Sequence, residues 1–220
     1  MKFVRHVPLL VAGAVALMAA APSFRQGTTY HVTKTIPLGI DGGWDYLTVD
    51  PDAKRLYISR GGANLVQVVD LGTNAQIGTI DSTRGVHGIA LAPEFNRGFT
   101  SNGGDSTVTI FDLKTMKQVG KVTVTGRNPD AILYDPFSKR VFTFNHTGKN
   151  TTAIDAATGK LRWYYSHAPG EAFDLDVVFE RVLIDGPGRD KWVLSVGKDG
   201  ILWKHDRKSG TYLDHVETVY

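Results

Sequence analysis

Three consecutive stretches of the chain are variants of one unit and decide the fold: WDYLTVDPDAKRLYISRGGANLVQVVDLGTNAQIGTI (44–80), VHGIALAPEFNRGFTSNGGDSTVTIFDLKTMKQVGKVTV (86–124) and PDAILYDPFSKRVFTFNHTGKNTTAIDAATGKLRW (129–163). A proline, an arginine and an aspartate recur in every unit, in steps of 42 and then 43 residues. These landmarks are Pro51, Pro93 and Pro136, then Arg55, Arg97 and Arg140, then Asp70, Asp112 and Asp155. A fixed period shared by independent landmarks indicates a repeat architecture.

Each unit reads as four short strands joined by tight turns. Apolar runs alternate with turns rich in Gly, Asn and Pro, and the prolines fall at strand ends, where a missing N–H removes no ladder bond. The recurring aspartates precede a turn whose backbone N–H groups they can accept, so we interpret them as structural. Four strands in about 42 residues predict an all-β fold, a β-propeller of four-stranded blades. A β-sandwich with coincidental spacing is the alternative.

The number of blades follows from the length of the chain. With the first 21 of 220 residues removed, 199 remain, which gives fewer than five blades. We therefore expect an incomplete or open propeller of four to five blades, either a small ring or a fragment or fusion. The alternating segment Tyr30–Leu38 is expected to supply one more strand, which in many propellers closes the last blade.

The N-terminus reads as a secretory signal peptide over residues 1–21. Lys2 and Arg5 precede an uncharged apolar run that is shorter than the ~20 residues of a spanning helix, and Ala19 and Ala21 fit the cleavage rule. An uncleaved membrane anchor is the alternative. The expected location is the periplasm or the exterior of the cell, with no membrane span after cleavage. The chain has no cysteine, so disulfides and thiolate chemistry are excluded.

The charge balance argues against a nucleic-acid partner. The formal net charge is +3, from 25 basic and 22 acidic residues, and the first 21 residues hold two of the bases and no acid. The remainder is therefore close to neutral and creates no field that would attract a polyanion. A protein or a small molecule is the expected partner.

The repeats resemble the YVTN-type repeat propellers over about residues 28–160. The shared pattern is a turn of the form D/A-P-x-x-x-R followed by apolar and aromatic residues, with strand ends such as VQVVD and TVTIFD. This resemblance implies a propeller and an exported location. It implies little about chemistry, because one fold carries many functions.

The segment of about residues 153–220 resembles a second family, the pyrroloquinoline quinone (PQQ)-dependent alcohol dehydrogenases. DAATGKLRW (155–163) is similar to that family's tryptophan motif, and WYYSHAPGEAFDLD (163–176) and GKDGILWKHDR (197–207) follow. The resemblance implies that Asp174 is the catalytic base and a metal ligand, that Asp176 is a second metal ligand, and that Lys198 binds the quinone. The implied cofactors are PQQ with Ca²⁺ or a lanthanide. Phe173 stands where the family has Trp.

The remaining parts of a quinone site, including a vicinal cysteine pair, have no counterpart in this sequence. We therefore expect an exported propeller that acts as a binding or scaffold module and is non-catalytic on its own. The alternative is a PQQ-dependent alcohol dehydrogenase, or a fragment of one. Whether the protein is an enzyme stays open at this point.

A further candidate site comes from the repeat itself. Asp45, His87 and Asp130 hold the same place in successive units, just before the first strand. That strand lines the central channel of a propeller, so these side chains are expected to gather near one mouth and to bind a ligand or an ion. Solvated loop residues are the alternative. The histidines of the chain show no H-x-H or H-x-x-x-H spacing, so local sequence does not indicate a zinc site.

Overall fold

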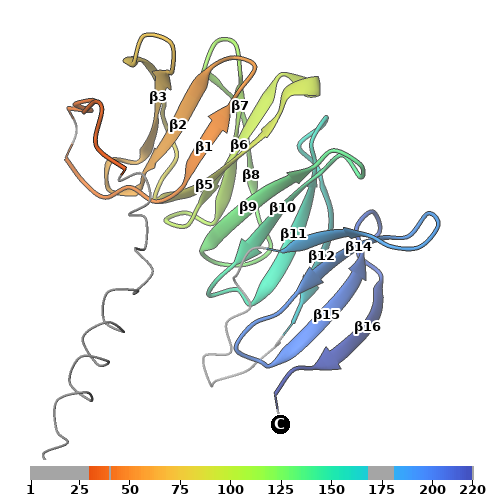
Figure 1. Cartoon of the computed structure of the whole chain (residues 1–220). Coiled ribbons are helices and arrows are strands. Elements are labelled where there is room, and N and C mark those ends of the chain that lie inside the picture. Colours follow the sequence, from red (N-terminus) through yellow and green to blue (C-terminus); the bar gives the residue numbers. More distant parts are fainter. Residues whose placement is uncertain (1–29, 40, 168–180, 220) are drawn as a thin grey trace, which may run out of the picture. The chain divides into compact units, whose positions relative to one another are not determined.

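The computed structural model describes residues 30–39, 41–167 and 181–219 (Figure 1). Within these ranges sixteen strands form four antiparallel four-stranded sheets, each a meander in chain order. The first sheet comprises β1 (Leu47–Asp50), β2 (Arg55–Arg60), β3 (Leu65–Asp70) and β4 (Ala75–Ile80). The second comprises β5 (Val86–Ala92), β6 (Arg97–Asn102), β7 (Thr107–Asp112) and β8 (Gln118–Thr123). The third comprises β9 (Pro129–Asp135), β10 (Arg140–Asn145), β11 (Asn150–Asp155) and β12 (Leu161–Ser166).

The fourth sheet comprises β13 (Val182–Asp185), β14 (Lys191–Ser195), β15 (Ile201–Asp206) and β16 (Tyr212–Glu217). Two short 3₁₀ turns, η2 (Gly61–Ala63) and η3 (Pro93–Phe95), are the helical elements of the described residues. This architecture is an open β-propeller of four blades, and the predicted fold class is confirmed. The described part of the chain contains no helix long and apolar enough to cross a membrane.

The recurring aspartates hold turns, as their position predicted. Asp70 Oδ1 accepts hydrogen bonds from the backbone N–H groups of Gly72 (3.0 Å) and Thr73 (2.7 Å). Asp112 and Asp155 close the matching turns of the next two sheets. The N–H of Thr73, and then its hydroxyl, lower the pKa of Asp70, so the turn stabilises the ionised carboxylate.

The core lies between neighbouring sheets. One apolar cluster joins the first sheet to the second and contains the fully buried Tyr57 and Phe111, whose ring centroids are 5.9 Å apart. A second cluster joins the second sheet to the third around Phe99 and Val141. A third cluster surrounds Phe142 and reaches the fourth sheet. Each sheet therefore buries its apolar face on its neighbour, as a stacked repeat requires.

The expected strand over Tyr30–Leu38 is wrong, because residues 30–39 contain no strand. Residues 30–35 belong to a separate unit and are exposed, and the larger unit begins at Ile36. Within that larger unit, the carbonyl of Leu38 accepts a hydrogen bond from the side chain of Gln67. An alternating sequence forms a strand only where another strand offers it backbone partners. The predicted signal peptide at residues 1–21 lies outside the described residues.

Candidate functional site

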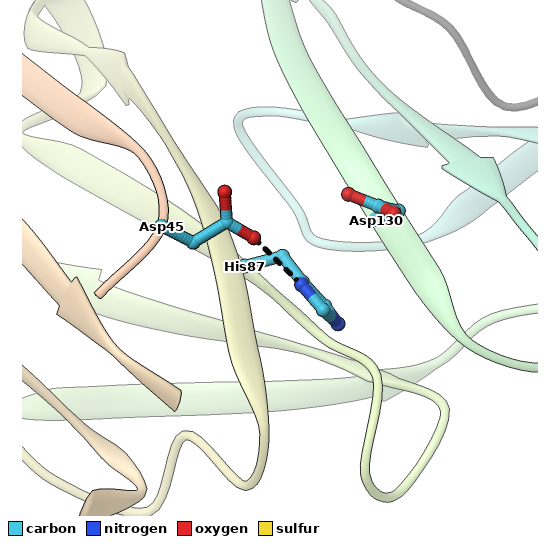
Figure 2. Close-up of side chains that lie close together, drawn as sticks. All are labelled: Asp45, His87 and Asp130. Atoms are coloured by element: carbon cyan, nitrogen blue, oxygen red, sulfur yellow. Dashed lines mark hydrogen bonds and ion pairs between the residues drawn. The ribbon is translucent and has the colours of Figure 1, made fainter. Parts of the chain in front are cut away.

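Asp45, His87 and Asp130 lie together, as their shared position in the repeat predicted. Asp45 precedes β1, His87 lies in β5 and Asp130 lies in β9, so three sheets each supply one group. Figure 2 shows His87 between the two carboxylates. His87 Nδ1 is 2.8 Å from Asp45 Oδ2, and one ligand atom from each of the three residues lies within 4.8 Å of the others.

Hydrogen bonds between neighbouring first strands fix the spacing of the cluster. The N–H of Tyr46 donates to the carbonyl of His87 (3.3 Å), and the Thr48 hydroxyl donates to the carbonyl of Ile89 (2.9 Å). These bonds join the chain around β1 to β5 one residue from Asp45. The side chains of Asp45 and His87 therefore project from backbones that are tied to each other.

Two serines in equivalent places hold the backbone beside the site. Ser59 Oγ accepts from the N–H of Asp45 (3.2 Å) and donates to the carbonyl of Tyr46 (3.1 Å). Ser101 Oγ, one repeat later, accepts from the N–H of Gly88 (2.9 Å) and donates to the carbonyl of Asp130. The second serine thus connects the second sheet to the third. Sequence reasoning missed both serines, although their 42-residue separation in equivalent strands is a usable signal.

A cavity of about 420 Å³ opens beside the cluster, and Asp45 and His87 are in its wall. Six glycines also line it: Gly43, Gly61, Gly62, Gly85, Gly103 and Gly104. Gly103 is needed for steric reasons, because a Cβ there would lie 2.7 Å from His87 Nε2 and 2.2 Å from Asn128 Oδ1. The lack of a side chain at Gly103 therefore leaves room for the His87 ring.

Burial raises the pKa of Asp130, and the nearby Asp45 carboxylate raises it further. His87 and His146 act in the opposite direction and lower it. The Asp130 carboxylate is therefore partly withdrawn from water beside another carboxylate, an arrangement that a cation would stabilise.

Two carboxylates and one imidazole are a suitable donor set for a divalent metal ion. Zinc binds imidazole nitrogen and carboxylate oxygen at about 2.0–2.2 Å, so its ligand atoms lie up to roughly 4 Å from one another. The separations of up to 4.8 Å in the cluster approach that range. Local sequence spacing gave no sign of this set, because each ligand comes from a different repeat.

Of the residues implied by the quinoprotein resemblance, the described part of the chain includes Lys198 alone. Asp174 and Asp176 lie outside the described residues. Lys198 lies in the turn between β14 and β15 and is exposed. The quinone site therefore stays a prediction from the sequence resemblance.

A second group of titratable residues lies where the third sheet meets the fourth. His167 and His205 are 6% and 2% exposed, and both ring centroids lie within 6 Å of the Tyr165 ring. Burial, with Arg181 nearby, lowers the pKa of His167 to about 2 and that of His205 to about 4. Both imidazoles are therefore neutral members of the core.

The fold and the site together describe an open four-bladed propeller with a polar cluster at the N-terminal ends of its first strands. No family model and no curated protein matches the sequence. Among solved structures, the hydrazine synthase of Kuenenia stuttgartiensis is similar with a TM-score of 0.64 at 18% identity. The alignment covers 87% of this chain and 52% of that one.

Two dehydrogenases are similar at the same level. The quinohemoprotein alcohol dehydrogenase ADHIIG of Pseudomonas putida HK5 has a TM-score of 0.63 at 17% identity, over 76% of this chain and 33% of that one. A europium-containing methanol dehydrogenase has a TM-score of 0.62 at 16% identity, over 81% of this chain and 41% of that one. These likenesses establish the propeller fold, and this chain spans about half or less of each similar protein.

Proposed function

We propose that this protein is an exported propeller that acts as a binding module, and that it binds a divalent metal ion through Asp45, His87 and Asp130. The observation that carries the proposal is the convergence of three ligand atoms within 4.8 Å from three successive sheets. Export to the periplasm or the exterior is part of the proposal and rests on the N-terminal sequence. The role is non-catalytic.

The surroundings of the cluster favour a cation over other small ligands. Burial and the neighbouring Asp45 disfavour the charged form of Asp130, and a divalent ion would reverse both effects. Three protein ligands leave at least one coordination position of a tetrahedral ion open. The adjoining cavity of about 420 Å³ gives a polar group of a partner or a small molecule room to occupy that position.

Calorimetric titration of the EDTA-treated protein with ZnCl₂, MnCl₂ and CaCl₂ tests the proposal. We expect one site per chain that prefers Zn²⁺ to Mn²⁺ and Ca²⁺, because an imidazole is among the ligands. His87→Gln and Asp130→Asn should each weaken binding at least tenfold. Glu94→Gln is the control, since Glu94 follows the opposite end of β5 from His87 and pairs with Lys139. Absence of binding, or equal loss in the control, would overturn the proposal.

The second candidate is a PQQ-dependent alcohol dehydrogenase, or part of one. It is favoured by the sequence resemblance over residues 153–220 and by the two structurally similar dehydrogenases. In that case Asp174, Asp176 and Lys198 would hold PQQ with Ca²⁺ or a lanthanide, and the cofactor would accept hydride from the alcohol. Dye reduction with ethanol after addition of PQQ and Ca²⁺, abolished in Asp174→Ala, would support the enzyme. Absence of PQQ binding would remove it.

A further inference from the structure

Among the described residues, no neighbouring sheet covers one apolar face of the first sheet. Leu47 of β1 pairs with Ile58, just as Ile89 of β5 pairs with Thr100, so Leu47 and Ile89 hold equivalent positions. Ile89 is 5% exposed because it packs on the first sheet, whereas Leu47 is 54% exposed. Val49, which precedes the turn after β1, is 53% exposed.

This face also has a cavity of about 480 Å³. Its walls include Leu47, Leu56 and Ile58 from the sheet, with Ile36 and Leu38 from the segment before it. In the second and third sheets the same face is covered by the preceding sheet. The first sheet therefore presents the face that, in the second and third sheets, packs on the preceding sheet.

The fourth sheet presents the complementary face, the one that in the first three sheets packs on the next sheet. Leu183 and Val193 face the third sheet, and the side chains that alternate with them face the opposite way. That opposite face holds a cavity of about 230 Å³. Its lining combines apolar side chains with three polar ones: Ile184, Trp192, Leu194, Leu202 and Val216, with Lys204, Asp214 and His215. Val216 is 57% exposed, and the Lys204 ammonium lies 3.5 Å from the centroid of the Trp192 ring.

We propose that a second copy of this chain covers both faces, with the first sheet of each copy packed on the fourth sheet of the other. The contact continues the packing already present three times within the chain, where one face of each sheet covers the opposite face of the next. A contact between two different faces closes into a ring when its rotation allows. Two copies of four sheets give eight, which is within the range of closed propellers.

One observation favours a second copy over another protein. The two faces without a neighbouring sheet are of the complementary kinds that meet between the described sheets, and both occur on each copy. This inference is independent of the proposed metal site.

Sedimentation velocity and light scattering on the full chain test the inference. We expect a species of twice the chain mass of 24.0 kDa. Leu47→Lys and Val216→Glu should each give a monomer, because either change damages both contacts of the ring. Val119→Lys is the matched control, since Val119 is equally exposed, at 57%, on the second sheet, whose two faces are already covered.

A mixture of the Leu47→Lys and Val216→Glu proteins should regain the double mass. The mixed pair has one contact between unsubstituted faces and one in which lysine meets glutamate. A monomer at all concentrations would overturn the inference, as would open polymers or a dimer that tolerates Val216→Glu. Zinc binding measured on the same samples tests the proposed function separately, because none of these substitutions touches the cluster.

Discussion

Gly103→Ala gives the sharpest test of the metal site, because it leaves all three ligands in place. The backbone of Gly103 is not in the left-handed region, so alanine is conformationally acceptable there. Its Cβ would lie 2.7 Å from His87 Nε2, whereas ordinary contact begins at 3.4 Å. The imidazole must therefore move by about 0.7 Å. Because metal–ligand distances tolerate only roughly 0.2 Å, this movement disturbs the position of the His87 ligand.

Gly103→Ala is expected to weaken metal binding as much as the displacement of one ligand, the His87 imidazole. Changes that disturb the orientation of a ligand cost 10–100-fold in metal affinity, or about 1.4–2.8 kcal/mol. The folding cost should lie near the lower end of the ~1–3 kcal/mol range for overpacking, because the nearest atoms are the ends of the His87 and Asn128 side chains. Calorimetric titration with ZnCl₂ measures the affinity, and urea unfolding measures the stability.

Gly120→Ala is the matched control, since a Cβ at Gly120 meets its nearest neighbour, Ile110 Cδ1, at 3.6 Å. It should bind zinc like the unsubstituted protein and be of equal or slightly higher stability. If Gly103→Ala folds and binds zinc with unchanged affinity, the His87 imidazole is not a ligand, and the reasoning from the cluster geometry fails.

Three further predictions concern stability. Gly98→Ala places a Cβ 2.0 Å from the buried ring of Phe111 and should lower the unfolding free energy by at least ~1–3 kcal/mol in urea titrations; an unchanged midpoint would contradict the packing. The pKa of His205 is lowered to about 4, so the unfolded chain binds its proton first as pH falls below ~6.5. Stability should drop by roughly 1.4 kcal/mol per pH unit from pH 6 to 4 on this account, and His205→Gln should reduce the slope. The pKa of Asp130 is raised, which destabilises the metal-free fold once pH exceeds the unfolded value; Asp130→Asn should therefore raise the Tm of the EDTA-treated protein at pH 7 and abolish its increase with zinc.

The repeat made much of the fold predictable. For the first three sheets, the steps of 42 and 43 residues between prolines and aspartates predicted the four strands of each sheet and the turns that Asp70 and Asp112 hold. The segment Tyr30–Leu38 was misread for a physical reason. Alternation reports which faces of a segment are apolar, but it does not report whether a partner strand lies within hydrogen-bonding distance.

The site was predictable in position and not in geometry. Equivalent places in successive repeats located Asp45, His87 and Asp130 at one end of the first strands. The hydroxyls of Ser59 and Ser101 and the steric need for Gly103 depend on distances between sheets, which no local pattern contains. The raised pKa of Asp130 likewise arises from burial and from neighbours far away in the sequence.

The sequence by itself determined the blade: its period, its strands, its turns and the apolar faces that a single blade cannot cover. Only the tertiary structure decided what those faces meet, because packing between sheets fixes separations to tenths of an ångström whereas the repeat fixes only order along the chain. It brought the imidazole of one repeat within 4.8 Å of the carboxylates of two others. It also left Leu47 and Val216 exposed on two sheet faces that have no neighbouring sheet among the described residues.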